Sequence, residues 1–305
     1  MFKMFLAGSV DPTTNAFIAQ KGYPRLMSYG YQVDEISYFC KEKREGRYNG
    51  MIMVDSGAFS VFKSGHEIRI DDYVAFINSH PEVDRYVELD FIPGQFGQQR
   101  TAEQALEGAQ KSFENYVYMV SKVNCPEKIM PVYHAGEPWS HLAKIVNHKP
   151  DGAHYVRSIC VSGPKSVGNS PILAKFLTDC FAIIRESENP NVEVHALGIG
   201  VVEALECQPL YSSDFSSWVM ASATGTIMTK DFGTLCVSDR GVAKSVVNMP
   251  KEAKEALGEY VKKYGFTLES LVSDYKERWK FNATQVEAIS QGISHTPKLS
   301  GVGLF

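Results

Sequence analysis

Short apolar runs recur along the chain, and each of them is closed by polar residues or by glycine. Several runs are continuously apolar rather than alternating, which is typical of strands buried on both faces of a parallel sheet. We therefore predict one strand for each run. The runs begin at Met4, Arg25, Met51, Tyr86, Ile129, Tyr155, Glu193 and Leu210.

Segments with helical signals lie between these runs. The clearest starts at Thr101, which forms a capping-box pattern with Gln104 and precedes apolar residues at helical spacing. Pro171 opens another, because proline is favoured in a first helical turn. Eight strands that alternate with helices predict an α/β fold, the (β/α)8 TIM barrel, for which ~250 residues is usual. A doubly wound open sheet is the main alternative.

The pattern changes after Trp218. Residues 223–239 have the pattern of a β-hairpin with Gly233 near its turn. Residues 251–292 predict two or three helices, with Asn282 as the cap of the last one. We expect these elements to pack on the barrel as an appendage.

Length and composition indicate one ordinary globular domain. The chain has 305 residues, of which 44% are hydrophobic and 22% are charged, and these values exclude fibrous and disordered classes. We expect a single domain over residues 1–305, in which a barrel of about residues 1–245 carries a helical appendage of about residues 246–305. The net charge of −4 argues against binding nucleic acid through an overall basic surface and leaves a local basic groove open.

The cysteines and the apolar segments indicate the compartment. Six cysteines are scattered without a CxxC pair, which predicts neither a disulfide framework nor a compact zinc site and suits a reducing cytoplasm. The first apolar run ends at Asp11 and Pro12 and is too short for a signal peptide, and no run reaches the ~20 residues of a membrane span. We therefore expect a soluble, cytoplasmic protein with no membrane partner.

Charged residues gather where the predicted strands end. Asp55, Asp90 and Asp214 lie at or near the ends of three runs, His134 closes a fourth, and His195 lies in a fifth. Reacting groups of barrel enzymes sit at the carboxyl ends of the strands. A single aspartate there can simply cap a helix or form a turn, and each histidine can be a satisfied core residue. Three aspartates at equivalent ends favour a site.

Two carboxylates that meet at a barrel mouth can cleave a bond at the anomeric carbon of a sugar. One carboxylate attacks that carbon or stabilises its positive charge, and the other moves a proton on the leaving group. A third carboxylate can read a ligand, because it accepts two N–H bonds in one plane. Metal-dependent hydrolysis uses the same residue types but normally shows closer His and Asp spacings than this chain has.

These residues belong to an ordered series of motifs that resembles the guanine transglycosylases, a family that exchanges guanine for a 7-deazaguanine base in nucleic acid. The series extends from about Met51 to Trp218. The resemblance implies a TIM-barrel glycosyltransferase of the pentosyltransferase class. The motifs are DSGAF at Asp55, ELDFIPG around Asp90, PVYHAGE around His134, HALGIG before Gly200 and SSDFSSW around Asp214.

The resemblance implies a role for each of these residues. Asp214 would be the nucleophile, and Asp55 would transfer a proton beside it. Asp90 would read the guanine edge, and Phe59 would stack on the base. The rest of the expected substrate-binding set is Ser56, His134, His195, Gly198 and Gly200. We expect Ser213 and Ser216 to orient the nucleophile or line the pocket, and Trp218 to pack in the core.

Two departures from the transfer-RNA enzymes of that family matter. Those enzymes carry Gln-Gly-Gly where this chain has HAG, so His134 replaces a base-reading glutamine. They also bind a structural zinc through CxCxxC and a later histidine, whereas this chain keeps only Cys236 in that region. We therefore expect no metal and no cofactor. The chain is most similar to the DNA-modifying branch found in bacteriophages, which would place it in a host cytoplasm.

The expected partners are duplex DNA with a flipped guanine and a 7-deazaguanine base such as preQ0. Transfer-RNA guanine exchange, a non-catalytic nucleic-acid-binding subunit and a barrel glycoside hydrolase are the alternatives, and the oligomeric state stays open. Two basic runs are candidates for a DNA-binding rim, with merely solvated faces as the alternative. They comprise Lys41, Lys43, Arg44 and Arg47, and then Lys276, Arg278 and Lys280.

Overall fold

Short parallel strands form one continuous sheet, around which most of the chain is built. The computed structural model describes residues 2–58, 67–94, 100–164, 170–237 and 245–294. Within these segments the strands are ordered β5-β4-β3-β2-β1-β9-β8-β7-β6. They are β1 (Lys3–Leu6), β2 (Arg25–Ser28), β3 (Ile52–Asp55), β4 (Arg85–Val87), β5 (Ile129–Met130), β6 (Val132–His134), β7 (Ser158–Ser162), β8 (Glu193–Leu197) and β9 (Ser212–Phe215).

The two ends of this strand order are halves of a single predicted strand. Pro131 separates β5 from β6, because proline has no N–H to donate to a ladder. The Pro131 carbonyl accepts a hydrogen bond from Cys160 N at 2.8 Å, and Met130 O accepts one from Glu88 N at 3.0 Å. The interrupted strand thus bonds to β4 on one side and to β7 on the other. This arrangement confirms the predicted eight-stranded barrel and not the alternative, a doubly wound open sheet.

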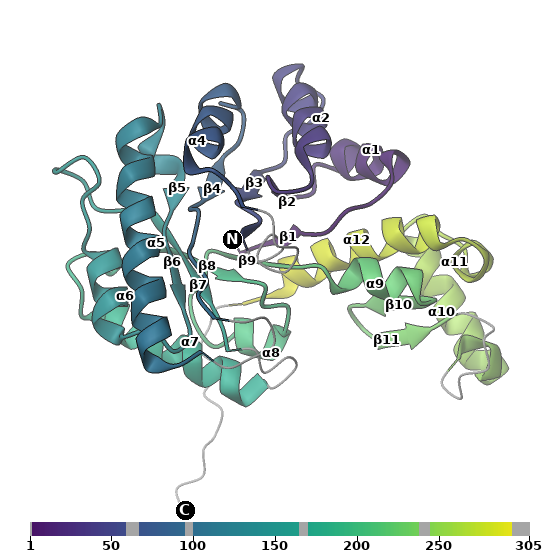
Figure 1. The fold of residues 1–305 in the computed structure, drawn as a ribbon. Helices are drawn as coiled ribbons and strands as arrows, with labels where there is room; N and C mark the ends of the chain where they lie inside the picture. The colour runs from purple at the N-terminus through teal and green to yellow at the C-terminus, as the bar shows by residue number, and fades with distance from the viewer. Residues whose placement is uncertain (1, 59–66, 95–99, 165–169, 238–244, 295–305) are drawn as a thin grey trace, which may run out of the picture.

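Helices follow the strands and surround the barrel (Figure 1). The capping box predicted at Thr101 is confirmed, since both of its hydrogen bonds with Gln104 are present at the start of α5. Within the described residues, no helix is long and apolar enough to cross a membrane. The helices are α1 (Pro12–Lys21), α2 (Val33–Arg44), α4 (Ile70–Ser79), α5 (Ala102–Lys122), α6 (Trp139–Val146), α7 (Ser170–Arg185), α8 (Val202–Leu205) and α9 (Ser217–Ala223), with the 3-10 turn η1 (Pro126–Lys128).

The predicted appendage follows α9 and has an apolar core of its own. A hairpin of β10 (Thr226–Thr229) and β11 (Gly233–Cys236) precedes η2 (Val246–Asn248), α10 (Lys251–Lys263), α11 (Leu268–Ser273) and α12 (Tyr275–Gly292). Figure 1 shows the hairpin, α10 and α11 beside the barrel, on the side away from α5 to α7. The shared core includes Ile227, Leu257, Val261, Leu271 and Phe281.

Helix α12 joins the appendage to the barrel. Its Ser290 hydroxyl accepts a hydrogen bond from Met4 N of β1 at 3.0 Å. Asn282 lies in the middle of α12 and is fully buried, so its predicted role as a helix cap is wrong. Asp274 caps the helix instead, and the run from residue 275 continues the helix through Asn282 without a break. Trp218 is fully buried, as predicted, and donates to Ala7 O at 2.9 Å.

Alternation along the strands decides which side chains face the barrel interior. An interior apolar cluster is separate from the larger core between the strands and the helices. Because side chains alternate along a strand, Asp55 shares the inward face of Met53, and His134 shares that of Val132. His195 likewise shares the face of Leu197. The cluster comprises Phe5, Ala7, Leu26, Met53, Val87, Met130, Val132 and Cys160, with Met51 and Leu197 packed against it.

The buried Asn282 side chain should be a strong determinant of stability. Its amide donates to Ser222 Oγ at 2.8 Å and to Thr226 O at 3.2 Å, and its oxygen accepts from Met228 N at 2.8 Å. We expect Asn282→Ala to lower the free energy of unfolding by roughly 3 kcal/mol, because buried backbone groups lose their partners. Urea unfolding measures this change. The exposed Gln291 on the same helix is the control, and an equal effect of Gln291→Ala would contradict the interpretation.

Candidate active site at the carboxyl end of the barrel

The structure brings the three predicted aspartates to one end of the barrel. Asp55 is the last residue of β3, Asp214 lies within β9, and Asp90 follows the end of β4. The charges of Asp214 and Asp90 both act on Asp55. After burial itself, the charges of Asp214, Glu88, Asp90 and Asp55 raise the pKa of the buried Cys160 thiol. Because such effects weaken with distance, these groups share one region of the barrel mouth.

Asp214 is buried and held mainly by β8. One carboxylate oxygen, Oδ1, accepts from the Gly198 amide at 2.7 Å and lies 3.1 Å from His195 Nε2. The second ring nitrogen, Nδ1, lies 2.9 Å from the Ser212 hydroxyl. Gly198 has φ of +69°, a conformation that favours glycine and turns its amide toward the carboxylate. Two residues of the HALGIG motif, His195 and Gly198, therefore contact the Asp214 carboxylate directly.

Asp55 has the properties of a proton carrier near neutral pH. Burial raises its pKa to about 7, and the negative charges of Asp214 and Asp90 add to this rise, while the Ser28 hydroxyl and the Gly57 amide oppose it. Gly57 has φ of +79°, and a Cβ atom there would lie 2.5 Å from Ser28 Oγ. The DSG turn thus requires its glycine. Asp55 can hold or release a proton without a large cost at physiological pH.

Asp90 is paired with His134. His134 Nε2 lies 2.9 Å from Asp90 Oδ2, and the exposed fraction of both side chains is 11%. The His134 backbone amide donates to Glu137 Oε2 at 3.0 Å, so the HAGE turn fixes the histidine. Burial raises the pKa of Glu137. Asp90 Oδ2 therefore already has one hydrogen-bond partner. The carboxylate can still accept N–H groups from a ligand, because each of its oxygens has two lone pairs.

The other predicted site residues have more local roles in the structure. The Ser213 hydroxyl donates to the carbonyls of Ala196 and Ile199, so it positions the β8 turn and not the Asp214 carboxylate. Ser216 is exposed. A Cβ atom on Gly200 would lie 2.8 Å from the Phe215 side chain, so this glycine allows close packing. Ser56 is buried beside Asp55, and Phe59 lies outside the described residues.

A buried carboxyl group that was not predicted from the sequence lies beside this site. Glu88 is 1% exposed, and burial raises its pKa well above the usual value. Its Oε1 accepts from Val132 N at 2.7 Å, just after the strand break at Pro131. Glu88 therefore completes the hydrogen bonding between β4 and β6. The available signal was a glutamate inside the apolar run YVELD, where a charge is unusual.

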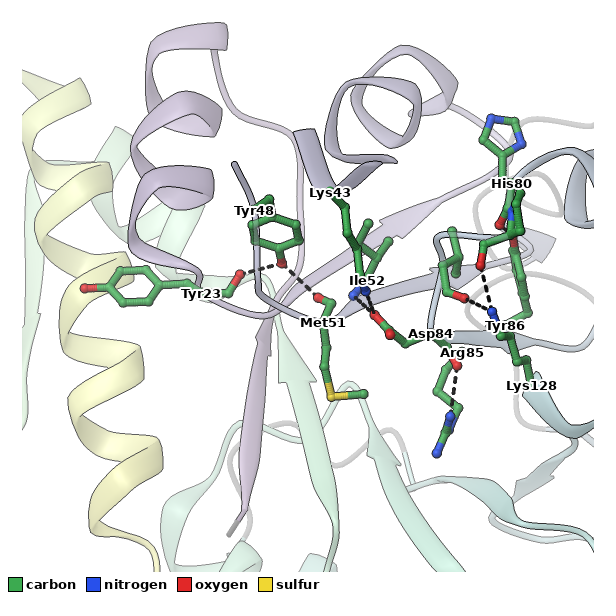
Figure 2. A network of polar contacts seen from close by, with 12 residues as sticks. Tyr23, Lys43, Tyr48, Met51, Ile52, His80, Asp84, Arg85, Tyr86 and Lys128 are labelled. Carbon is green, nitrogen blue, oxygen red and sulfur yellow. Dashed lines mark hydrogen bonds and ion pairs between the residues drawn. The ribbon is translucent and has the colours of Figure 1, made fainter. Parts of the chain in front are cut away.

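The first basic run lies at the opposite end of the barrel. Lys43 pairs with Asp84 at 2.5 Å, and the same Asp84 oxygen accepts from Ile52 N, at the start of β3 (Figure 2). Arg44 pairs with Glu82, and Arg47 pairs with Glu42 and Glu45, while Lys41 is exposed on the same helix end. Since Asp55 ends the strand that Ile52 begins, this run does not border the aspartates. The structure therefore does not support it as a rim of the site.

The second basic run has mixed environments. Arg278 is buried and donates to the carbonyls of Ser222 and Leu271, at 2.7 and 2.8 Å, so its role is structural. Lys276 pairs at 2.8 Å with Asp11, which follows β1 at the same end of the barrel as Asp55. Lys280 pairs with Glu277 at 2.7 Å. Only the start of this run lies on the side of the site.

No protein-family model matches the chain, and no curated protein matches it. Within the described segments, no group of three or more His, Cys, Asp or Glu is arranged to hold a metal ion.

The raised pKa of Asp55 predicts a specific pH dependence of stability. The folded protein keeps this proton up to about pH 7, whereas the unfolded chain loses it near the ordinary value of 3.8. Between these values the folded state binds more protons, so its stability falls as the pH rises. Asp55→Asn removes this loss. We expect its advantage over the wild type to grow from about pH 4 to 7 and then stay constant, at a few kcal/mol.

Thermal unfolding of both proteins across this pH range measures the effect. Asp34→Asn, which removes one exposed negative charge, is the matched control. Parallel pH profiles for the wild type and Asp55→Asn would contradict the raised pKa.

Proposed function

We propose that this protein exchanges guanine in DNA for a 7-deazaguanine base, such as preQ0, through a covalent aspartyl–sugar intermediate. The observation that carries the proposal is the arrangement of Asp214 and Asp55. Asp214 is a buried carboxylate with one oxygen held by Gly198 and His195. Asp55 has a pKa of about 7, and the charge of Asp214 acts on it. A nucleophile and a proton carrier are the two groups that base exchange needs.

In the first half-reaction, Asp214 attacks the anomeric carbon of a guanosine nucleotide. A carboxylate oxygen supplies the electron pair for the new C–O bond, and the glycosidic bond breaks with its electrons going to N9 of guanine. Protonated Asp55 delivers a proton to the departing base. A pKa of about 7 suits this step, because the acid is populated at neutral pH and still gives up its proton readily.

In the second half-reaction, the 7-deazaguanine replaces guanine. Asp55, now ionised, takes the proton from N9 of the incoming base, and N9 displaces Asp214 from the anomeric carbon. The bond broken and the bond formed are nearly equivalent, so the exchange requires no energy from a nucleotide cofactor. One residue serves as acid and then as base, which returns the enzyme to its starting state.

The Asp90–His134 pair is suited to recognise both bases. Guanine and 7-deazaguanine present the same N1–H and exocyclic N–H edge, which a carboxylate can bind in one plane. His134 holds Asp90 at 2.9 Å and adds a second polar group from the neighbouring β6. The pair therefore supports selection of a guanine-type edge.

The choice of DNA over transfer RNA rests on the sequence departures and on the appendage. The region after Trp218 retains a single cysteine, Cys236, and its elements pack around apolar residues such as Ile227 and Phe281. A segment with this core can fold through apolar burial without a structural metal. A target base in duplex DNA must leave the stack, which costs a few kcal/mol.

Base exchange measured side by side on DNA and transfer RNA tests the proposal. We expect labelled guanine and preQ0 to enter DNA, and a denaturation-resistant protein–DNA adduct to form when free base is absent. Asp214→Asn should abolish both, whereas Asp179→Asn, at a partly exposed aspartate on the outer helix α7, should retain both. Incorporation into transfer RNA alone would assign the other polymer, and release of free base without exchange would indicate a hydrolase. An adduct that persists in Asp214→Asn would exclude this nucleophile.

The two half-reactions should respond to pH in opposite directions. Adduct formation needs protonated Asp55, so its single-turnover rate should fall as the pH rises through about 7. Discharge of the adduct by added base needs ionised Asp55 and should slow as the pH falls through the same value. Rapid-quench measurements of each step from roughly pH 5.5 to 8.5, on both sides of this pKa, resolve the two pH dependences. Asp55→Asn should remove both dependences, and pH-independent rates in the wild type would contradict the role of Asp55.

A further inference from the structure

The two oxygens of the Asp214 carboxylate have unequal environments. Oδ1 accepts from the Gly198 amide at 2.7 Å and lies 3.1 Å from His195 Nε2. Among the described residues, none donates a hydrogen bond to Oδ2. Lone pairs that already accept hydrogen bonds are poorer nucleophiles, so the two oxygens differ in reactivity.

The surroundings of His195 fix which of its ring nitrogens carries the proton. Its exposed fraction is 1%, and its ring lies edge-on to Phe5 with 5.9 Å between ring centroids. An ionised Asp214 cannot donate a hydrogen bond, so His195 Nε2 must carry the hydrogen in that contact. Nδ1 then accepts from the Ser212 hydroxyl at 2.9 Å. The Asp214 carboxylate thus selects the tautomer, and the Ser212 hydroxyl, which can donate or accept, holds the far side of the ring.

Resting on the proposed function, we infer that His195 is a positioning residue that holds Asp214 Oδ1, so that Oδ2 is the attacking oxygen. Gly198 contributes the second N–H to Oδ1, and the Ser212 hydroxyl holds the other side of the His195 ring. Three residues of two adjacent strands and one turn thus orient a single carboxylate. His195 itself does not contact the base.

The same contacts act in both half-reactions. When Oδ2 bonds to the anomeric carbon, Oδ1 becomes the carbonyl oxygen of an ester and keeps its two N–H donors. When N9 of the incoming base displaces the ester, the C–Oδ2 electron pair returns to Asp214. The two donors at Oδ1 stabilise this returning charge without any proton transfer, as preorganised donors do in other acyl and glycosyl sites. His195 therefore affects the departure of the carboxylate as well as its attack.

Substitutions of His195 separate this role from simple packing. His195→Phe keeps an aromatic ring against Phe5 but loses the N–H, and we expect adduct formation and discharge to slow by roughly 10- to 100-fold, the loss typical of one hydrogen bond to a charged group. The KM for the base should stay unchanged. His195→Gln can donate to Oδ1 and should recover much of the rate. Ser212→Ala should slow both steps by a smaller factor.

The control is His154→Phe, at an exposed histidine remote from the barrel mouth, which should match the wild type. Equal rates for the wild type and His195→Phe, in an enzyme that exchanges bases, would overturn the inference and leave the proposed function intact. A loss in His195→Gln as large as, or larger than, the loss in His195→Phe would also overturn it, because the N–H donor would then not be what the site requires. If the wild type exchanges bases on neither DNA nor transfer RNA, the proposed function is instead refuted.

The tautomer can be measured without any activity. Nitrogen NMR of protein labelled with ¹⁵N-histidine, with His195 assigned from the resonances lost in His195→Gln, reports the protonation of each ring nitrogen. We expect hydrogen on Nε2 and an unprotonated Nδ1 in the wild type, and the same tautomer in Ser212→Ala, because the Asp214 carboxylate that selects it is still present. Hydrogen on Nδ1 in the wild type would overturn the inferred geometry whatever the protein catalyses.

Discussion

The site depends on one electrostatic constraint, which is that several carboxyl groups are buried together at one end of a barrel. Like charges in a poorly solvated region repel, so each group needs a partner or a proton. Asp214 receives N–H donors from β8, and Asp90 is paired with His134. Asp55 lacks a cationic partner among the described residues, and its pKa rises to about 7. Burial without a cationic partner therefore raises the proton affinity of Asp55, whereas Asp214 and Asp90 each lie against a histidine.

The barrel creates this constraint through its geometry. All of its strands run parallel, so their carboxyl ends meet at one mouth, and alternation sends every second side chain inward. The apolar interior below the mouth, from Phe5 to Cys160, keeps water from screening the charges. At the strand break at Pro131, the regular ladder is interrupted, and the Glu88 carboxyl bonds to Val132 N in its place. The barrel is therefore closed partly by a side chain, which adds another buried acid to the group.

Much of the fold could be predicted from the sequence because its signals are local. Runs of apolar residues identified all eight strand positions, and the Thr101 capping box marked the start of α5. Asn282 was misassigned because a polar residue before an apolar stretch has the same local pattern in a cap and in the middle of a helix. The positions of Asp55, Asp90 and Asp214 at strand ends were also predictable. Their partners were not, because the contacts of His195 and Glu88 depend on the register between strands, which a local pattern does not contain.

The site contains two aspartate–histidine pairs, and their surroundings make them unequal. His134 pairs with Asp90 where both side chains keep some exposure, so a ligand can reach the carboxylate beside the ring. His195 is almost fully buried and has Ser212 behind it, so it can only act through Asp214. A histidine that borders the mouth can change which ligand is accepted, whereas a histidine beneath a carboxylate can change only how that carboxylate is oriented. Under the proposed base exchange, substitutions at position 134 should therefore alter selectivity between bases, and substitutions at position 195 should alter the rate for every base alike.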